Sequence, residues 1–422
     1  MVVYKLNISM NPNFDRNINV VPREDDDEKE CIVYLEVTKK VEDGIYDAYV
    51  DFRRLEDIAI FKQMCDETGD FGQRNTYLHL QSFRSAKRLM RGCYYALNLA
   101  LLLNFQYSVA EDSLFVGRTY DLSQMEMPQD ESGELLQSHQ PLDPEQMLVM
   151  HPNSQMQIAP LQDANLKLFV RDVDQANWNE LLEDDTIRVI YDIGARLNAS
   201  KAEVAALFDA RKTEIMRDKP MLVLSHWDMD HIHCLRYLDE NDFSKCFSKL
   251  ICVDMMKSVT STAVYSSFVS ALGAANVSCL QVPPRTDGIA MHLSKREGNM
   301  VFYVGEKSRN INFSGVCMFV DGPSQSVAFT GDVKLIQAQS MYDQERNNGL
   351  NKARHILIAP HHGGDYSASS RVYSQPLTEV IISVGNGNQY GHPDPHMLSY
   401  LDNLSGSNVK RTDINGDITE ML

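Results

Sequence analysis

The sequence has no apolar run long enough to cross a membrane. Its longest apolar stretch, residues 93–105 (CYYALNLALLLNF), contains two asparagines and falls short of the roughly 20 residues that a membrane-spanning helix needs. The first residues also lack a basic segment followed by an apolar one, which is the pattern of a secretory signal peptide. We therefore expect a cytoplasmic protein that does not associate with membranes.

Closely spaced cysteine pairs are missing as well. Eight cysteines are scattered over 422 residues, and no two of them form a Cys-x-x-Cys pair. In a chain of this length, that distribution is typical of reduced thiols, most of them packed in the interior.

Positive charge is scarce. The chain has 58 acidic and 40 basic residues, which gives a formal net charge of -18. Such a balance keeps a protein soluble and repels polyanions at long range. Contact with a nucleic acid would therefore require a local basic patch or bound metal cations.

The one notable basic cluster falls in residues 82–103, whose spacing predicts a helix. One face of that helix would carry Arg84, Lys87, Arg88 and Arg91. This face could contact phosphates, or it could be a solvated surface balanced by the abundant acidic residues.

The texture of the sequence divides the chain into three parts. Residues 1–118 alternate charged segments with short β-like runs and predict an accessory mixed α/β domain, a candidate for recruiting substrate or a protein partner. Residues 119–163 are rich in Gln, Met, Pro and Ser, which predicts a linker or an extended loop. In residues 164–422, short apolar runs alternate with helical patterns, which predicts a layered α/β domain.

Acidic residues and histidines directly follow several of these apolar runs. In chain order they are Asp192, the cluster 226–231, Asp332, the pair His361 and His362, and His392. Loops at the ends of strands are where functional sites gather on a rigid sheet. We therefore expect these five loops to converge on one site.

The densest cluster is HWDMDH, residues 226–231. If His226 ends a strand, the loop can return Asp228 to the same point, whereas Asp230 and His231 lead into a helix and face an adjacent point. Two such pairs suit two metal ions about 3.5–4 Å apart. Imidazole and carboxylate ligands suit Zn²⁺, Mn²⁺ and Fe²⁺, and the carboxylate at 228 favours Mn²⁺. Structural alternatives are a backbone-bonded His226, an Asp230 that caps the helix and an Asp332 that serves as a turn residue.

In its motifs and their order, the chain resembles the metallo-β-lactamase fold hydrolases. It is most similar to the C-terminal hydrolase domain of the competence protein ComEC, which has His-x-Asp-x-Asp-His where this chain has HWDMDH. The other matching segments are FVRDVDQANW, IYDIG, FTGD, APHHGGDYSAS, ISVGNGNQYGHP and KRTDINGDI. The resemblance covers roughly residues 165–420 and implies an αββα sandwich, with two sheets inside, helices outside and the site at one edge.

The same resemblance implies a ligand set for two divalent ions, Zn²⁺ or Mn²⁺. It assigns His226, Asp228 and His361 to one ion, Asp230, His231 and His392 to the other, and Asp332 to a bridging position. His362 could replace His361 or protonate the leaving group, which makes His362 and Asp230 the expected catalytic residues. Asp192 would orient the ligand loops. The substrate edge would be shaped by Ser383, Asn388 and Tyr390.

Several positions depart from the pattern of that branch. Ile232 and His233 stand where that branch usually has Gly-Gly. His233 is either an extra ligand or a structural histidine. Helical spacing points its side chain away from His231, which favours the structural role. Gly364 replaces a usual serine, and the nearby Asp365 is a further candidate to reach the site. The sequence carries no membrane channel, so a role in DNA uptake does not follow.

The implied chemistry is hydrolysis by a hydroxide held between the two metal ions. The leading interpretation is a phosphodiesterase or nuclease that acts on a nucleic acid or a nucleotide. One alternative is a small-molecule hydrolase for a cyclic nucleotide or an acyl compound, and another is a non-catalytic scaffold. The fold alone does not decide among them.

Overall fold

The structure is a computed structural model that describes the C-terminal part of the chain almost completely and the N-terminal part in segments. It describes residues 17–18, 30–42, 45–54, 57–58, 60–61, 77–84, 89, 93–98, 106–109, 114–118 and 156–422, apart from gaps at 162–164, 198, 239, 255–257, 309, 351, 365–372, 374–376, 389 and 407. The chain divides into two compact units, residues 1–147 with 257–263 and residues 148–256 with 264–422.

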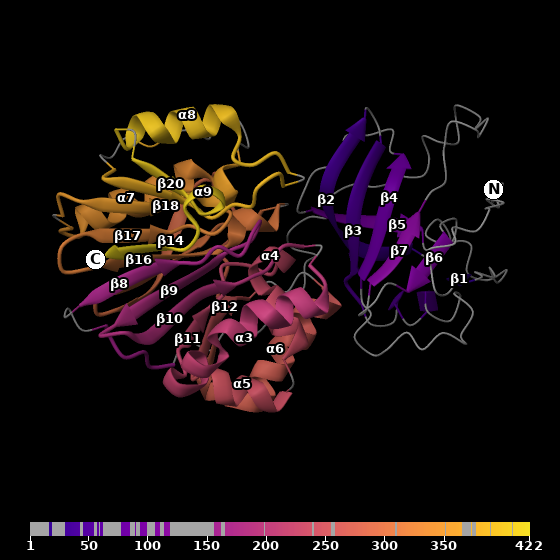
Figure 1. Ribbon diagram of the computed structural model, residues 1–422, viewed down its shortest axis with the longest axis horizontal. Coiled ribbons are helices and arrows are strands. Elements are labelled where there is room, and N and C mark those ends of the chain that lie inside the picture. Colours follow the sequence, from indigo (N-terminus) through magenta and orange to yellow (C-terminus); the bar gives the residue numbers. More distant parts are fainter. Residues whose placement is uncertain are drawn as a thin grey trace. The chain divides into compact units, whose positions relative to one another are not determined.

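The first unit contains a seven-stranded sheet in the order β1-β6-β7-β4-β3-β2-β5 (Figure 1). Its strands are β1 (Asn17–Ile18), β2 (Glu30–Glu42), β3 (Ile45–Phe52), β4 (Tyr77–Arg84), β5 (Cys93–Asn98), β6 (Gln106–Val109) and β7 (Leu114–Arg118). Alternate residues of β2, such as Val33 and Leu35, enter one apolar core together with Val50 of β3 and Leu78 of β4. This period of two is the pattern of a strand with one face on a core.

The helix predicted over residues 82–103 is wrong. Arg84 ends β4, and β5 pairs antiparallel with β2, which places Tyr94 opposite Tyr34 and Cys93 opposite Leu35. Tyrosine favours strands, and burial between two neighbouring strands outweighs the helix propensity of the nearby Ala and Leu residues. Of the four basic residues, Arg84 lies on a strand, and Lys87, Arg88 and Arg91 lie outside the described residues, so their contact with phosphates stays a prediction.

The second unit contains two seven-stranded mixed sheets. The first has the order β13-β12-β11-β10-β9-β8-β21, with β8 (Leu166–Val170), β9 (Trp178–Glu183), β10 (Thr186–Ile193), β11 (Met221–Val223), β12 (Lys249–Val253), β13 (Val277–Leu280) and β21 (Ile418–Met421). The strands β10 to β13 are parallel, and the remaining neighbours are antiparallel.

The second sheet runs in the order β14-β15-β16-β17-β18-β19-β20. Its strands are β14 (Met291–Glu297), β15 (Met300–Gly305), β16 (Val316–Asp321), β17 (Ser326–Phe329), β18 (His355–Ile358), β19 (Glu379–Ile382) and β20 (Val409–Arg411). The strands β17 to β20 are parallel, whereas β14 to β17 form antiparallel pairs. Each sheet thus has a parallel half whose strand ends carry loops at one edge.

The helices of this unit are short to medium in length. They are α3 (Lys201–Asp218), α4 (Met229–Ile232), α5 (Glu240–Cys246), the part of α6 (Val259–Leu272) from Val264 onward, α7 (Leu335–Asn347), α8 (Pro395–Leu404) and α9 (Thr412–Asn415). Four short 3-10 helices are η4 (His233–Tyr237), η5 (Ala274–Asn276), η6 (Ile311–Ser314) and η7 (Pro360–Gly363). The start of α3 is fixed by a capping box, in which Ser200 accepts from the Glu203 amide and Glu203 accepts from the Ser200 amide.

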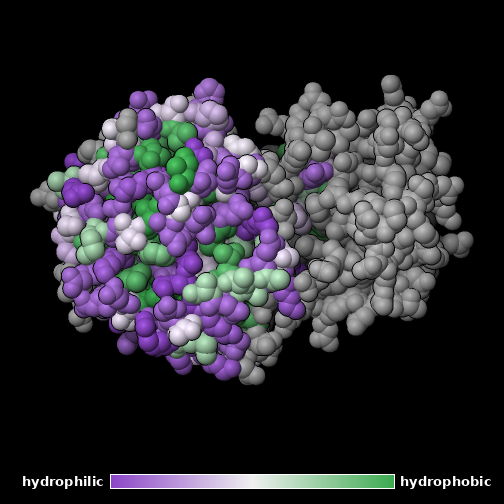
Figure 2. Space-filling view, in the orientation of Figure 1, coloured by the Kyte–Doolittle hydropathy of each residue, from purple (hydrophilic) through white to green (hydrophobic). Residues whose placement is uncertain are grey.

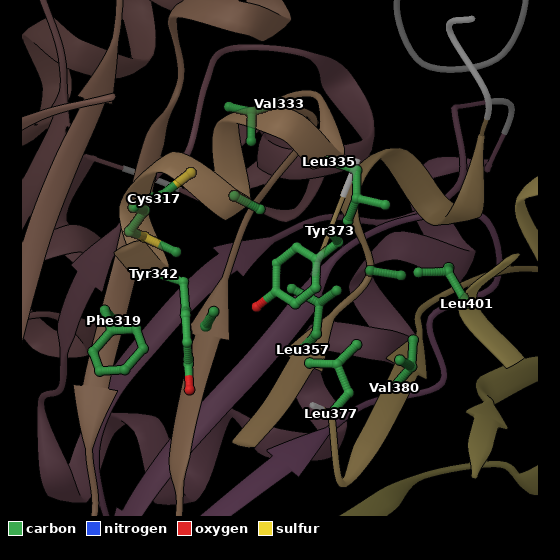
Figure 3. Packing of buried hydrophobic residues seen from close by; sticks show 14 of the residues in the cluster. Cys317, Phe319, Val333, Leu335, Tyr342, Leu357, Tyr373, Leu377, Val380 and Leu401 are labelled. Carbon is green, nitrogen blue, oxygen red and sulfur yellow. The ribbon is translucent and has the colours of Figure 1, made fainter. Parts of the chain in front are cut away.

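The two sheets of this unit pack face to face, and helices cover their outer faces. Between the sheets, the Tyr191 ring of β10 lies 5.1 Å from the Phe329 ring of β17, and its hydroxyl donates to the Val316 carbonyl at 2.6 Å. On the outer face of the second sheet, an apolar cluster joins the strands to α7 and α8 (Figure 3); its labelled members include Phe319, Leu335, Tyr342, Leu357, Val380 and Leu401.

The first sheet has a matching outer layer. The Phe208 ring of α3 lies 6.5 Å from the Trp178 ring of β9, and Phe243 of α5 packs edge-on against Phe268 of α6 at 4.5 Å between centroids. Figure 1 shows α3, α5 and α6 on the side of the first sheet and α7 and α8 on the side of the second. The predicted αββα sandwich is therefore confirmed.

Among the described residues, polar side chains lie mostly on the surface, and the cysteines lie in the interior. Hydrophilic residues predominate on the visible face of the second unit (Figure 2), and the large apolar side chains exposed among the described residues are Ile289, Leu293, Ile414 and Met421. Seven of the eight cysteines lie in the described residues, and all seven are buried. Among the described helices, none combines the length and the apolar character that a membrane crossing would take.

A buried histidine lies within the second sheet. His355 of β18 pairs its Nδ1 with the Ser326 hydroxyl at 2.9 Å and its Nε2 with the Tyr373 hydroxyl at 3.0 Å. Because burial disfavours the charged ring, the pKa of His355 falls to about 3.

This depressed pKa predicts a loss of stability in acid. The unfolded-state pKa of histidine is about 6.5, so the contribution of a neutral buried His355 is complete above that pH and is lost as the pH falls toward 3. Between these two pH values, His355 should change the free energy of unfolding by up to about 1.4 kcal/mol per pH unit. Urea denaturation between pH 7 and pH 5 should therefore show a shallower pH dependence for His355→Gln than for the wild type. Equal slopes would contradict the assignment.

Candidate metal centre

The acidic residues and histidines singled out in the sequence come from loops at the carboxyl ends of strands in both sheets. Asp192 ends β10, the cluster 226–231 follows β11, and Asp332 follows β17. The pair His361 and His362 lies in η7 after β18, and His392 follows β19. Because the parallel strands place these loops at one edge, residues far apart in the sequence become neighbours.

Asp332 lies at the middle of the group. Its Oδ1 is 3.2 Å from His231 Nε2, and its Oδ2 is 2.7 Å from His361 Nδ1 and 3.9 Å from His226 Nε2. The Asn312 side chain of η6 donates to the same Oδ2 at 3.3 Å. One buried carboxylate thus faces histidines from two other loops, which is the position that a bridging ligand requires.

The two other aspartates of HWDMDH also face this group. Asp228 immediately precedes α4, yet its side chain makes no capping bond, and its Oδ2 lies 3.5 Å from His226 Nε2. Asp230 lies inside α4 rather than at its start, with Oδ1 3.7 Å from His231 Nε2 and Oδ2 3.2 Å from His362 Nε2. Neither carboxylate is used to cap the helix.

The donor atoms form two overlapping sets that could each hold a metal ion. One set is His226, His231 and Asp332, the other is Asp230, His231 and His362, and within each set the ligand atoms lie within 4.8 Å of one another. The buried Nε2 atoms of His226 and His231 have no hydrogen-bond partner among the described residues. Since buried polar atoms are normally paired, and imidazole and carboxylate are ligands for Zn²⁺ and Mn²⁺, the residues fit a divalent metal.

The three remaining histidines are distributed differently from the pairing that the resemblance implies. His362 donates from Nδ1 to the Ser383 carbonyl at 2.7 Å, which leaves Nε2 beside Asp230. His392 lies beside His361, with 5.0 Å between ring centroids. The structure thus brings His362, and not His392, next to Asp230 and His231. The roles of the three histidines as ligands stay predictions.

An unusual backbone conformation turns two consecutive rings toward the centre. His361 and His362 have φ angles of 50° and 53°, in the left-handed region that side chains other than glycine seldom adopt. Such conformations persist only where the surroundings enforce them and are common at functional sites.

Asp192 orients a ligand rather than facing the centre directly. Its Oδ1 accepts from the Ser225 amide at 2.7 Å, and its Oδ2 accepts from the Ser225 hydroxyl at 2.8 Å and from His231 Nδ1 at 2.8 Å. A carboxylate behind a histidine fixes the ring orientation and the tautomer. Sequence reasoning missed Ser225, although a hydroxyl residue directly before the first histidine of the cluster was visible.

The residues predicted to shape the substrate edge, Ser383, Asn388 and Tyr390, make hydrogen bonds or ring contacts in and around the loop after β19. The Ser383 hydroxyl donates to the Ala176 carbonyl at 2.7 Å. Asn388 Oδ1 accepts from the amides of Tyr390 and His392, and its Nδ2 donates to the His392 carbonyl at 2.6 Å. The Tyr390 ring stacks on His392 at 5.9 Å with 11° between planes. This network holds His392 in place, and contact with substrate stays a prediction for all three candidates.

His233 is directed away from the centre. Its Nδ1 lies 3.0 Å from the Arg196 carbonyl, and burial lowers its pKa to about 4. A neutral ring that donates to a backbone carbonyl is a structural histidine, as the helical spacing predicted. Asp365 lies outside the described residues.

Aspartates and histidines at the centre shift one another's pKa values. Burial opposes a charge on His231, but the neighbouring Asp332, Asp192 and Asp230 raise its pKa well above the usual value. Burial also opposes a charge on Asp332, yet His361 and His231 hold the pKa of that carboxyl well below its usual range. The carboxylates therefore attract positive charge to the centre, which protons or a metal ion can supply.

Two glycines allow the loops to approach one another. A Cβ at Gly194 would lie 1.7 Å from the Asp230 carbonyl oxygen. A Cβ at Gly364 would lie 2.5 Å from atoms of both the His361 and His392 rings. A serine would not fit at 364 without moving a ring, which gives a physical reason for glycine at this position.

No protein-family model matches the sequence, and no curated protein matches it. Among solved structures, the metallo-beta-lactamase fold protein YhfI from Bacillus subtilis is similar over 61% of this chain and 100% of its own, with 10% identity and a TM-score of 0.34. Tm1679, a metal-dependent hydrolase of the beta-lactamase superfamily, is similar over 61% and 100%, with 12% identity and a TM-score of 0.36. A diphosphatase of the PhnP family is similar over 61% and 98%, with 12% identity and a TM-score of 0.34. Because these identities and TM-scores are low, we assign the αββα layers from this chain's own sheets and helices. The resemblance to the ComEC branch stays a prediction.

Replacement of Gly364 by Ala should weaken metal binding. The added Cβ would displace the His361 or His392 ring, and changes around metal ligands typically reduce affinity by about 10–100-fold. Competition with a chromophoric chelator measures this loss. Gly273→Ala is the control, because Gly273 has a positive φ but no atom within 4 Å of an added Cβ. If both variants bind metal like the wild type, the packing around Gly364 does not shape the centre.

Proposed function

We propose that this protein is a metal-dependent hydrolase. The observation that carries the proposal is the buried Asp332 carboxylate, which faces His226 and His231 from the segment after β11 and His361 from the segment after β18. Divalent metal ions held there would lower the pKa of a water molecule and neutralise negative charge on the attacked group.

The residues around Asp332 form two groups that would each hold a metal ion. His226 and Asp228 flank one side of Asp332, whereas Asp230 and His231 flank the other. We place His362 with the second pair because its Nε2 lies 3.2 Å from Asp230 Oδ2 while its Nδ1 is held by a backbone carbonyl. The three aspartates make the donor set rich in oxygen, which favours Mn²⁺ while still allowing Zn²⁺.

A lysine close in sequence to Asp332 favours an anionic substrate. Lys334 lies two residues after Asp332, and its ammonium is 4.4 Å from the centroid of the Phe313 ring. Phe313 in turn follows Asn312, whose side chain contacts Asp332. Burial and the nearby Arg285 both lower the pKa of Lys334, and the described residues offer it no carboxylate within ion-pair distance.

An anionic group of a substrate would supply the missing partner. In a chain with a net charge of -18, two neighbouring cations, Lys334 and Arg285, suit a phosphodiester better than a neutral ester. We therefore place a nucleic acid or a nucleotide first among substrates. A cyclic nucleotide, as a small phosphodiester, fits the same observation, whereas an acyl compound would leave Lys334 unused.

Loss of the Asp230 carboxylate should abolish turnover. Purified protein loaded with Mn²⁺ or Zn²⁺ should cleave at least one of single-stranded DNA, duplex DNA, RNA or a cyclic nucleotide. Asp230→Asn keeps the shape but removes the charge, and we expect kcat/KM to fall by roughly 100-fold or more, about 2.7 kcal/mol of transition-state stabilisation. Asp209→Asn, on the exposed surface of α3, is the matched control. Full activity of Asp230→Asn would rule out the assigned centre.

Replacement of Lys334 by Met should act on substrate binding. We expect KM for a phosphodiester to rise by about tenfold, roughly 1.4 kcal/mol, with a smaller change in kcat. Lys245→Met removes an exposed lysine of α5 and should leave both constants unchanged. Steady-state kinetics with a phosphodiester and with a neutral ester separate the alternatives, since an equal effect on both substrates would show that Lys334 does not recognise the anion.

A further inference from the structure

Ser225 lies between two histidines of the metal centre. It follows β11, directly precedes His226, and is completely buried. Its hydroxyl oxygen is 2.8 Å from Asp192 Oδ2, 3.0 Å from His226 Nδ1 and 3.2 Å from His231 Nδ1. One hydroxyl therefore touches a carboxylate and the inner nitrogens of two rings.

The hydrogens in this group can be assigned by counting donors and acceptors. A hydroxyl has one hydrogen to donate and two lone pairs, and a carboxylate can only accept. The Ser225 hydroxyl therefore donates to Asp192. Its lone pairs then face His226 Nδ1, which forms a hydrogen bond only if that nitrogen carries the hydrogen.

His231 reaches the same state by a second route. Its Nδ1 lies 2.8 Å from Asp192 Oδ2 and 3.2 Å from the Ser225 oxygen, and both of these atoms accept from it. In its neutral form, each ring thus carries its hydrogen on Nδ1 and keeps a lone pair on Nε2 for a metal ion. These Nε2 atoms are the ones that have no hydrogen-bond partner among the described residues.

We propose that Ser225 is a positioning residue that holds His226 and His231 together in the tautomer that binds metal through Nε2. This inference rests on the metal centre of the proposed function. Because His226 flanks Asp332 on one side and His231 belongs to both donor sets, a single hydroxyl connects the two halves of the centre. Loss of the hydroxyl should release His226 first, since His231 is still held by Asp192.

The main chain keeps Ser225 in place independently of its hydroxyl. The Ser225 amide donates to Asp192 Oδ1 at 2.7 Å, and its carbonyl accepts from the Val316 amide at 2.7 Å. Gly331 packs so closely that a Cβ on it would lie 2.6 Å from Ser225 Cβ. Ser225→Ala keeps both main-chain bonds and adds no atom, so it removes only the hydroxyl.

The first test is the metal affinity of Ser225→Ala, measured by competition between the full-length protein and a chromophoric chelator for Zn²⁺ and Mn²⁺. We expect affinity to fall by about 10–100-fold, as for other partners of ligating histidines. Ser326→Ala is the matched control, because the buried Ser326 hydroxyl pairs with His355 Nδ1 at 2.9 Å in the same kind of bond without touching the centre. Wild-type affinity in Ser225→Ala, or an equal loss in Ser326→Ala, would overturn the inference.

The second test has its decisive readout in the wild-type protein, and this readout does not depend on the folding of a variant. In Zn²⁺-loaded protein with ¹⁵N-labelled histidine rings, NMR should show the hydrogen of both His226 and His231 on Nδ1. In Ser225→Ala, the His226 signals should report a mixture of tautomers while His231 keeps its Nδ1 hydrogen. A wild-type His226 with its hydrogen on Nε2 would overturn the proposed role.

The two tests also separate this inference from the proposed function. If the wild-type protein binds neither metal, the metal centre itself fails. If the wild type binds metal and Ser225→Ala binds it equally well, the centre stands and only the role of Ser225 fails.

Discussion

Four aspartate side chains are buried together at one edge of the two sheets, and their charge has to be balanced. Asp192, Asp228, Asp230 and Asp332 are each at most 7% exposed. Ionised carboxylates are costly to remove from water unless cations or hydrogen-bond donors compensate them. Histidines meet this need in part, as the raised pKa of His231 and the lowered pKa of Asp332 indicate. Divalent cations would meet it more completely, and the need for positive charge organises the whole centre.

The sandwich supplies the rigidity that such a charge arrangement needs. Tyr191 joins the sheets through its ring and its hydroxyl, and the bond from the Val316 amide to the Ser225 carbonyl joins them again directly beside the centre. The loops can then approach closely, with Gly364 between the His361 and His392 rings. Backbone strain at His361 and His362 is tolerated because the second sheet fixes the start of that segment, where the Ala359 amide donates to Ile381 and the His361 amide to Gly331.

The sequence predicted the layered domain and the aspartates and histidines that meet at its edge, because both depend on local patterns. The sequence directly shows apolar runs that are followed by HWDMDH, by Asp332 and by His361 and His362. Contacts between distant segments were not visible. The partners of Ser225 lie on β10 and α4, and the choice between a helix and the strands β4 and β5 depended on pairing with β2 and β3. Nor could spacing show that His362 rather than His392 lies beside Asp230.

X-ray absorption by the bound metal in loaded, full-length protein tests the central claim most directly. The account predicts a first shell of nitrogen and oxygen only, at about 2.0–2.2 Å for Zn²⁺, with scattering from imidazole rings. A second metal ion should appear at about 3.5–4 Å. Sulfur in the first shell, or a spectrum of hydrated metal without imidazole, would contradict the account, because the buried aspartates and histidines would then have a purpose other than metal binding.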